Sequence, residues 1–299
     1  MEHGREHFQK FLGRRFHPKR MNWIVLLALV CGMSVLIQGR QSHATEPPPL
    51  NTWQQLEPGL ELGVFVAPQP SDTGDSLIRV LRIDPACFDF RLLNASSSQD
   101  QQLRTAREWG QTHQLVAVIN ASMYQKDYQS SVSFMQTKGH INNPRLSKDK
   151  TILAFDRLSP EVPRVKMVDR QCENFDEWKE KYATFIQSIR MISCQGKNVW
   201  RQQPHKWSTA LIGIDSSGNV LFIHVRSHYS THDLINILLE LPLHISQAMY
   251  TEGGREAQLY IQSGDCEYEF VGRYGTGFDP RSYVPPIPNV IGITRRTEQ

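Results

Sequence analysis

Short apolar or alternating runs bounded by turn residues recur along most of this chain and constrain its fold more than any other feature. They are rich in Val, Ile and Phe and have the length of β-strands. The clearest case is a hairpin in which Ala210–Ile214 and Val220–Val225 flank the turn sequence Asp215–Asn219. The other predicted strands are Leu60–Ala67, Leu77–Ile83, Phe88–Leu93, Leu115–Ile119, Thr151–Phe155, Val165–Val168, Ile189–Ser193, Gln247–Tyr250, Gln258–Gln262 and Tyr268–Val271.

Three segments carry apolar residues at helical spacing, which predicts the helices Gln102–Gly110, Phe175–Gln187 and Ser230–Leu241. The last begins with Ser230 three residues before Asp233, a variant of the capping box, and stops at Pro242. Its apolar residues leave little polar face, so we expect it to be buried on a sheet. Together these elements predict an α+β fold, a single domain with a large mixed, mostly antiparallel sheet system flanked by a few helices.

The first 44 residues have the layout of an export signal. Basic residues precede an apolar run, Trp23–Ile37, and Ser42 and Ala44 are small residues at the −3 and −1 positions of a cleavage site before Thr45. The run is shorter than the ~20 residues that a spanning helix needs. We expect a cleaved signal peptide or an uncleaved N-terminal anchor, with residues 45–299 as one exported domain, periplasmic or secreted. Only an uncleaved N-terminal segment would contact a membrane.

The charge of the predicted domain disfavours a nucleic-acid partner. Seven of the 33 Lys and Arg residues and two of the 30 Asp and Glu residues lie in residues 1–44. The remainder has 26 basic and 28 acidic residues, so the basic balance of the whole chain belongs to the N-terminal segment. A near-neutral domain lacks the electrostatic footprint of a DNA- or RNA-binding protein.

Four cysteines remain in the predicted domain: Cys87, Cys172, Cys194 and Cys266. An even number in an exported domain is compatible with two disulfides in any of three connectivities, and free buried thiols are the alternative. No CxxC or Cys/His spacing indicates a zinc site. The histidines His224, His228 and His232 straddle a predicted strand, a loop and a helix start, so no regular spacing brings them to one metal.

Two polar sequences follow predicted strands and could carry chemistry. Glu252 precedes Gly253 and Gly254, two residues without a Cβ that permit a tight turn and let a ligand approach backbone N–H groups. Asn120 follows the strand Leu115–Ile119, and its amide can both donate and accept hydrogen bonds. The structural alternatives are an ordinary turn at Glu252 and an Asx-turn at Asn120.

The order and spacing of four segments resemble the phosphodiester glycosidase family. These segments are VINASMY, IQSIRMISCQGK, WSTALIGIDSSGNVLFIHVRSHYSTHDLINILLELPL and AMYTEGGREAQLY, and the resemblance spans about residues 76–295. It implies an exported hydrolase, because the best-known activity of the family cleaves the C1–O bond between N-acetylglucosamine and a phosphate. No cofactor is assigned, and the sequence identifies no ligands for a divalent cation.

The resemblance also implies site residues. Asn120 matches the strand-end Asn of the family, and Glu252 stands where many members have the Asp of Asp-Gly-Gly. Ser208 and Thr209 stand where many members have an Arg-Thr pair, so another arginine would have to replace the phosphate contact of the family. The candidates are Arg190, Arg226 and Arg255. From the residues alone, Arg190 could equally pair with a carboxylate.

The expected reaction releases free sugar and a phosphomonoester from a phosphoglycan or a small sugar phosphate. Because the leaving group is already a weak base, the demand for a general acid falls, and the site should support an oxocarbenium-like centre. We expect Glu252 to stabilise C1 or to activate water, with Glu256 as the second carboxylate. Asn120 would orient a sugar hydroxyl or a phosphate oxygen, while Gly253 and Gly254 shape the turn.

The alternative hypothesis is a non-catalytic envelope protein that binds glycans on the same fold. The loss of the family arginine at Ser208 favours this hypothesis. The presence of Glu252 and Asn120 favours the enzyme, since a binding protein has less need of a carboxylate beside the Gly pair.

Overall fold

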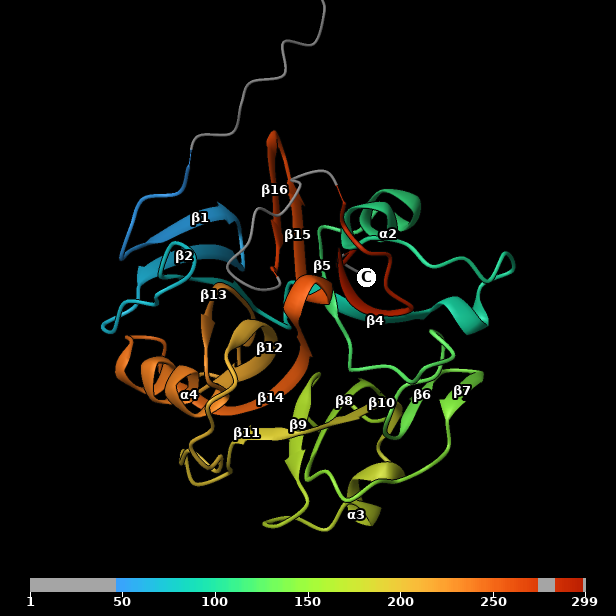
Figure 1. Ribbon diagram of the computed structural model, residues 1–299. Helices are drawn as coiled ribbons and strands as arrows, with labels where there is room; N and C mark the ends of the chain where they lie inside the picture. The colour runs from blue at the N-terminus through green and yellow to red at the C-terminus, as the bar shows by residue number, and fades with distance from the viewer. Residues whose placement is uncertain (1–46, 274–282, 298–299) are drawn as a thin grey trace, which may run out of the picture. The chain divides into compact units, whose positions relative to one another are not determined.

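The computed structural model describes residues 47–273 and 283–297. Its largest sheet has seven strands and contains the predicted hairpin (Figure 1). In order across the sheet, the strands are β1 (Trp53–Glu57), β2 (Leu60–Val66), β3 (Leu77–Ile83), β13 (Val220–Tyr229), β12 (Trp207–Asp215), β14 (Ile245–Gly253) and β11 (Arg190–Ile192). All neighbouring pairs are antiparallel. The β12–β13 hairpin is confirmed, and the N–H groups of Ser217 and Asn219 donate to the Asp215 carboxylate in its turn.

Two five-stranded sheets complete the described structure, and all their strand pairs are antiparallel as well. The second sheet has the order β7 (His140–Asn143), β6 (Met135–Thr137), β10 (Tyr182–Ser188), β8 (Thr151–Arg157) and β9 (Lys166–Asp169). The third has the order β16 (Cys266–Val271), β15 (Gln258–Ser263), β5 (Ala117–Asn120), β17 (Asn289–Arg295) and β4 (Phe88–Asn94). The antiparallel sheet system predicted from the sequence is therefore present.

The helix predicted for Phe175–Gln187 is wrong. Only α3 (Asp176–Lys179) is helical, and Tyr182–Ser188 forms the central strand β10 between β6 and β8. Almost every residue of β10 is buried, because both faces of the strand are covered. A short apolar run without alternation does not distinguish a buried strand from a helix by periodicity, and its pairing with β8 decides the outcome.

The other two predicted helices are present with shifted ends. Helix α2 is Ala106–His113, and a capping box between Thr105 and Glu108 fixes its start. Helix α4 is Thr231–Glu240, and Ser230 accepts a hydrogen bond from the N–H of Asp233, as its sequence predicts. Leu234, Ile235, Ile237 and Leu238 are buried against the seven-stranded sheet, whereas Leu239 is exposed. A short 3₁₀ helix, η1, covers Ala95–Ser97.

Besides β10, four further strands were not predicted from the sequence: β1, β6, β7 and β17. Strands β6 and β7 have only three and four residues, too few to show a period. The sequence of β17 is interrupted by Gly292, which lowers its strand signal. A Cβ at Gly292 would collide with Leu115, so close packing accounts for this glycine.

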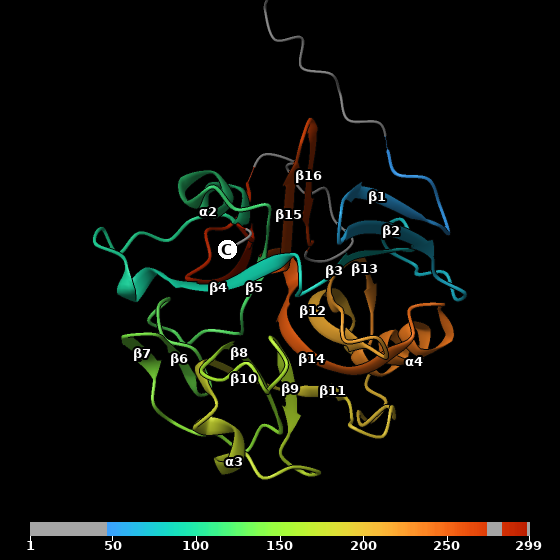
Figure 2. The ribbon, with the colours of Figure 1, turned by 180° about the vertical axis from the view of Figure 1, so that it is seen from behind.

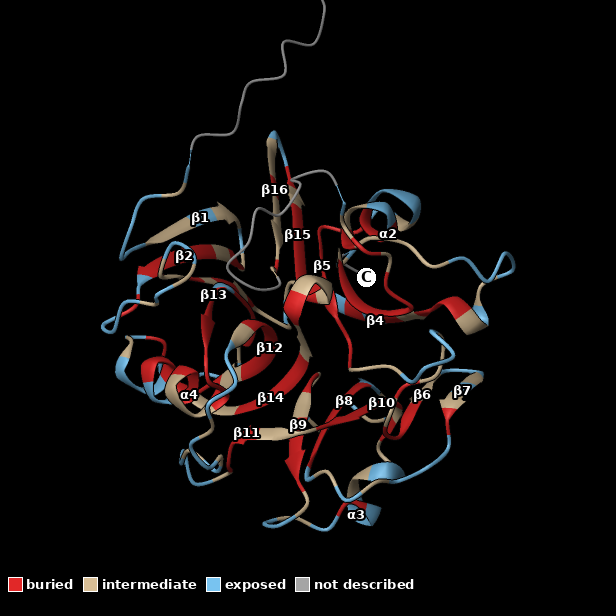
Figure 3. Cartoon of the chain, in the orientation of Figure 1, coloured by how far each residue is buried: buried red, intermediate tan, exposed pale blue. Residues whose placement is uncertain are grey.

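The main core is shared by all three sheets, and Leu153, Phe155 and Ile186 of the second sheet belong to it. Its buried residues also include Leu81, Phe222 and Met249 from the seven-stranded sheet, and Ile119 and Leu259 from the third. The strands are largely buried, whereas connecting loops and α3 are mostly exposed (Figure 3). Seen from behind, α2 covers β5 and β15 of the third sheet (Figure 2). Because β14 belongs to the seven-stranded sheet and β15 to the third sheet, the chain between them crosses from one sheet to the other.

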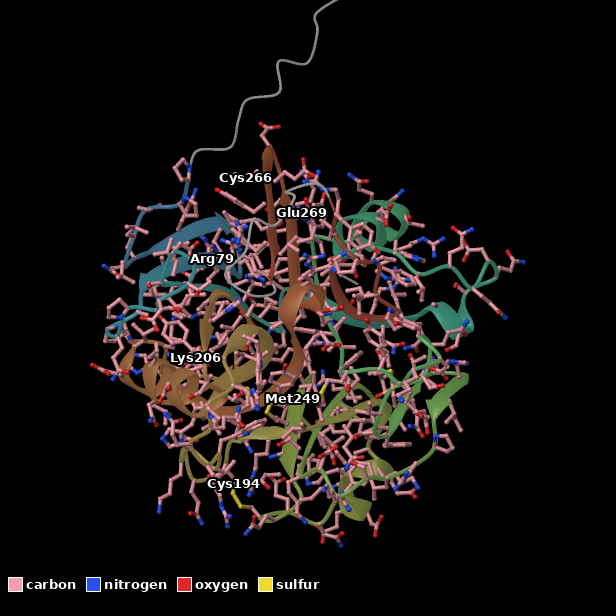
Figure 4. All side chains as sticks on the ribbon, in the orientation of Figure 1. Arg79, Cys194, Lys206, Met249, Cys266 and Glu269 are labelled. Carbon is pink, nitrogen blue, oxygen red and sulfur yellow. A yellow bond between two sulfur atoms is a disulfide. The ribbon has the colours of Figure 1, made fainter. Side chains whose placement is uncertain are left out.

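One disulfide joins Cys172 to Cys194, while Cys87 and Cys266 are free thiols (Figure 4). Of the alternatives left open by the sequence, the structure therefore contains one bridge and two free thiols. The described residues belong to one compact unit, Thr45–Gln299, and the predicted export segment lies outside them. No helix within residues 47–273 and 283–297 is long and apolar enough to cross a membrane.

Candidate active site

Glu252 lies where the chain leaves the seven-stranded sheet. It is paired across β12–β14 with Ala210, and the next residue, Gly253, is paired with Thr209. The chain then passes through the 3₁₀ helix η2 (Gly254–Glu256) into β15 of the third sheet (Figure 1). The Glu-Gly-Gly sequence thus occupies the crossover between two sheets, which explains why an apolar strand ends in a carboxylate followed by two glycines.

The two glycines are required for different reasons. Gly254 has a φ of +69°, a left-handed conformation that glycine adopts without strain and that starts η2. Gly253 has ordinary extended backbone, but a Cβ there would collide with the Tyr250 hydroxyl and lie 2.9 Å from Cδ1 of Trp207. The backbone conformation therefore requires glycine at position 254, and close packing requires it at position 253.

Burial raises the pKa of Glu252 to about 8, although the Gly253 N–H donates to its Oε1 at 3.0 Å and favours the ionised form. The negative charge of Glu256 raises the pKa further. Removing a carboxylate from water disfavours its charge, and a second carboxylate nearby acts in the same direction. At neutral pH, Glu252 is therefore mainly protonated and can donate a proton.

Asn120 holds η2 in place from the end of β5. Its Nδ2 donates to the carbonyl oxygen of Glu256 at 2.8 Å, and its Oδ1 accepts from the N–H of Gln258 at 2.7 Å. Asn120 is almost completely buried, so both bonds form away from water. The structure thus brings Asn120 next to Glu256, and its amide binds the backbone on either side of Ala257. The predicted contact of Asn120 with substrate stays a prediction.

His224 lies beneath the same crossover. It is paired with Ala210 on β12, and Ala210 is paired in turn with Glu252, so these residues form a row across three strands. Its Nε2 lies 3.2 Å from the carbonyl oxygen of Ala257, which can only accept, so this nitrogen carries the proton. Burial lowers the pKa of His224 to about 3, and the ring is neutral at physiological pH.

Sequence reasoning weighed His224 as a metal ligand against a hydrogen-bonded or surface histidine and assigned it no role in the site. Its position within the apolar alternation of β13 could have indicated an inward-facing side chain, because neighbouring residues at even spacing are core residues. Its partner Ala257 lies between η2 and β15, 33 residues along the chain, and no local pattern identifies that contact. His224 therefore becomes visible as part of the site only through the tertiary structure.

Arg190 is paired with a carboxylate, the second of the two fates considered from the sequence. Its Nη1 lies 2.9 Å from both carboxylate oxygens of Asp169, and its Nη2 donates to Gln171 at 2.8 Å. On β14 its backbone partner is Met249, three residues before Glu252. None of these contacts supports the predicted phosphate role of Arg190.

The hydroxyl of Ser208 is used within the fold. It donates to the carbonyl oxygen of Arg226 at 2.5 Å and accepts from the N–H of Arg273 at 2.9 Å. Its neighbour Thr209 is also buried, but no hydrogen-bond partner of its Oγ1 is present among the described residues. Arg255, in η2, is half-buried, and in the sequence it is adjacent to Glu256 and three residues after Glu252.

The structure offers one group of side chains with the spacing of metal ligands within the described parts of the chain. It consists of Asp169, Cys172 and Cys194. The two sulfur atoms are bonded to each other, and the Asp169 carboxylate accepts from Arg190, so this group does not fit a metal ion. A divalent cation, which the sequence left open, therefore has no assigned ligands.

Comparisons with known proteins find a matching family and similar folds. The family model of the phosphodiester glycosidases matches residues 113–294, which include Asn120, His224, Glu252 and Glu256. A search of curated proteins finds no significant match. Among solved structures, the catalytic domain of zebrafish N-acetylglucosamine-1-phosphodiester alpha-N-acetylglucosaminidase has a TM-score of 0.58 at 11% identity, over 81% of this chain and 86% of that one.

A second solved structure shares the fold. It is a hypothetical protein from Synechocystis with a TM-score of 0.53 and 12% identity, and the match covers 84% of this chain and 64% of that protein. At such low identities both structures establish similarity of fold alone. The family match extends over more than half of the sequence. The chain therefore belongs to the phosphodiester glycosidase family.

Proposed function

We propose that this protein is an exported glycosidase that hydrolyses a sugar-1-phosphodiester at the C1–O bond. The observation that carries the proposal is the carboxyl of Glu252 at the Gly253–Gly254 crossover, where burial and the nearby charge of Glu256 raise its pKa. Two acidic groups with different protonation states are what glycoside hydrolysis requires. The family membership supports the same class of reaction.

In the proposed reaction, water adds to C1 while the bond between C1 and the bridging oxygen breaks. The products are a free sugar and a phosphomonoester. Because Glu252 is protonated at neutral pH, it would donate its proton to the departing phosphate oxygen. Glu256 would then supply the carboxylate that takes the proton of water or stabilises the oxocarbenium-like centre. The raised pKa thus favours a proton donor at Glu252, rather than the base inferred from the sequence.

Backbone contacts of η2 would set the geometry of the two acids. Asn120 binds Glu256 and Gln258, and His224 binds Ala257, so side chains from β5 and β13 hold consecutive backbone groups. Such positioning matters because small displacements of a catalytic group can reduce the rate by orders of magnitude. Asn120 and His224 would act through Glu256, as positioning residues.

The test is proton NMR of the full chain mixed with an α-N-acetylglucosamine-1-phosphodiester, with and without EDTA. We expect free sugar to appear with the native protein and not with Glu252→Gln, because glutamine preserves the size of the side chain and removes its proton chemistry. The first anomer formed reports retention or inversion. Equal release by both proteins would remove Glu252 from the mechanism, and a loss with EDTA would indicate a metal.

The second candidate is a glycan-binding protein without catalysis, and Ser208 favours it. The hydroxyl of Ser208 binds the backbone of Arg226 and Arg273, so it does not replace the guanidinium that many family members have there. Saturation transfer from the protein to the phosphodiester without release of sugar would support this candidate. Release of sugar that depends on Glu252 would exclude it.

A further inference from the structure

We propose that a cavity at the C-terminal end of α2 binds one neutral sugar unit of a glycan, at a site separate from Glu252. We call it the α2 cavity. The residues that line it include Gln111, Gln114, Leu115, Tyr260, Gln262 and Glu267. Its volume is about 310 Å³. Small-molecule sites typically span about 300–1,000 Å³, so the α2 cavity has room for a single sugar ring.

Close packing of α2 on β15 forms one wall of the α2 cavity. Gly110 lies against the Tyr260 ring, where a Cβ would be 2.6 Å from two ring carbons. Leu115, which follows the helix, is buried and supplies apolar surface. Tyr260 packs with α2, whereas its neighbours Leu259 and Ile261 belong to the main core. Since successive strand residues face opposite sides, the α2 cavity lies on the face of the third sheet that α2 covers, away from the main core (Figure 2).

Gln114 holds a backbone conformation that favours glycine. It is the C-cap of α2 with a φ of +54° and a ψ of 46°. Glycine or asparagine usually occupies such a left-handed position, because a larger side chain is strained there. The Gln114 side chain is exposed at the α2 cavity, and its amide has no hydrogen-bond partner within residues 47–273 and 283–297. A strained glutamine without a partner in the fold indicates that its amide serves a ligand.

A hydrogen-bond network orients the other polar groups of the α2 cavity. The Tyr260 hydroxyl lies 3.1 Å from Oε1 of Glu267 and 3.3 Å from Oε1 of Gln262, and it can donate its proton to either. Tyr260 is only 1% exposed, so its position is fixed by packing. Nε2 of Gln262 donates to the carbonyl oxygen of Gly264 at 3.0 Å. This bond uses one of its two N–H groups, and the second can donate to a ligand.

The charges at the α2 cavity favour a neutral ligand. Glu267 is paired with Arg107 at 2.6 Å, and Arg295, which also lines the cavity, is paired with Glu57 at 2.8 Å. A phosphate or an ammonium ion would therefore compete with an existing ion pair. Glutamine amides both donate and accept, as sugar hydroxyls do, and Leu115 offers apolar surface to sugar C–H groups. The membership of the chain in a glycosidase family supports a sugar as this ligand.

The test separates binding from folding with Gln114→Gly. Glycine adopts the left-handed conformation without strain, so the urea midpoint of unfolding should stay unchanged or rise. The same change removes the amide and should weaken sugar binding about three- to tenfold, the effect of one lost hydrogen bond. A second variant, Gln111→Trp, places an indole at an exposed position of α2 that lines the cavity. It should block the α2 cavity and abolish binding there.

Gln101→Gly is the matched control. Gln101 is also an exposed glutamine with a positive φ, +50°, but it does not line the α2 cavity. We expect this control to match Gln114→Gly in stability and to leave sugar binding unchanged. Binding is measured by saturation-transfer NMR and calorimetry on the full chain. The probes are the methyl α-pyranosides of N-acetylglucosamine, glucose, galactose and mannose, with inorganic phosphate as the charged comparison.

Weaker binding by Gln114→Gly at undiminished stability, together with loss of binding by Gln111→Trp, would support the sugar site. Four results would overturn it: no binding of any pyranoside, tighter binding of phosphate than of every pyranoside, equal weakening by Gln101→Gly, or binding that neither cavity variant affects. The last result would place the sugar elsewhere on the protein. Because the experiment measures binding of glycosides without a phosphodiester, its outcome does not depend on the proposed hydrolysis at Glu252.

Discussion

Asn120 and Glu256 are 136 residues apart in sequence, yet the Asn120 side chain donates to the Glu256 carbonyl oxygen at 2.8 Å. This bond ties the end of β5 to the short helix that carries the second carboxylate. The same amide accepts from the N–H of Gln258, so one buried side chain fixes the backbone on both sides of Ala257. The arrangement of the two candidate acids therefore depends on a residue in another strand.

The first prediction concerns Asn120. Asn120→Ala should lower the free energy of unfolding by roughly 2–4 kcal/mol, because it leaves two buried backbone groups unpaired. Asn120→Asp keeps an acceptor for Gln258 but places a carboxylate against the Glu256 carbonyl. Protonation restores a donor, so the destabilisation by Asp should be smaller at about pH 4 than at about pH 8. Urea unfolding at both pH values measures this, and a pH-independent loss would contradict it.

The second prediction is a pH-dependent stability effect at Glu252. Its folded pKa, about 8, lies above its ordinary value of 4.5, so the unfolded state loses its proton first as the pH rises. The native protein should therefore lose stability between about pH 4.5 and about pH 8, by on the order of a few kcal/mol.

Glu252→Gln removes this titration. The variant should gain stability relative to the native protein as the pH rises from about 5 to about 9, in calorimetric melting curves. Glu161→Gln, at an exposed turn position, is a control for general charge effects. A constant difference between Glu252→Gln and the native protein over this range would show that the carboxyl has an ordinary pKa.

The same pKa predicts the pH profile of the proposed reaction. If Glu252 donates the proton, kcat/KM should fall about tenfold per pH unit above about pH 8, because the acid form disappears. If Glu252 is the base, kcat/KM should instead rise up to this pH. Sugar release measured over a range of pH shows whether kcat/KM rises or falls with pH, and this direction decides between the two roles of Glu252.

A further prediction concerns Gly253. Gly253→Ala should destabilise the protein by about 1–3 kcal/mol, since the new methyl group collides with the Tyr250 hydroxyl and crowds Trp207. Its extended backbone suits alanine, so packing alone is responsible. Adding Tyr250→Phe removes the hydroxyl and should recover part of the loss in a double-mutant cycle. Additive effects of the two changes would argue against this collision.

The disulfide gives the last prediction. Cys172 and Cys194 are 22 residues apart, and a loop of this length should contribute about 3 kcal/mol by restricting the unfolded chain. A reductant should therefore lower the urea midpoint of the native protein but not that of the Cys172→Ser/Cys194→Ser variant. Cys87→Ser, at a free thiol, should leave the sensitivity to reductant intact. Equal sensitivity of the native protein and the double variant would contradict the bridge.

Local patterns identified much of the fold. The β12–β13 hairpin follows from Asp215–Asn219, and the start of α4 follows from the capping of Asp233 by Ser230. Both depend on residues within a few positions of one another, where spacing fixes the direction of each side chain. For the same reason the sequence placed Glu252 at a strand end before two glycines, as the structure has it.

Contacts between distant segments were decided by the tertiary structure. The run Tyr182–Ser188 is a strand because β8 and β6 pair with it. Arg190 forms an ion pair with Asp169, which lies 21 residues earlier in the sequence. The protonated state of Glu252 likewise arises from burial between sheets and from Glu256 nearby. By itself, the sequence determined most of the strands, the turn of the central hairpin and which residues could do chemistry. Register and desolvation depend on the assembled sheets, so only the tertiary structure decided which of those residues meet and in which ionisation state.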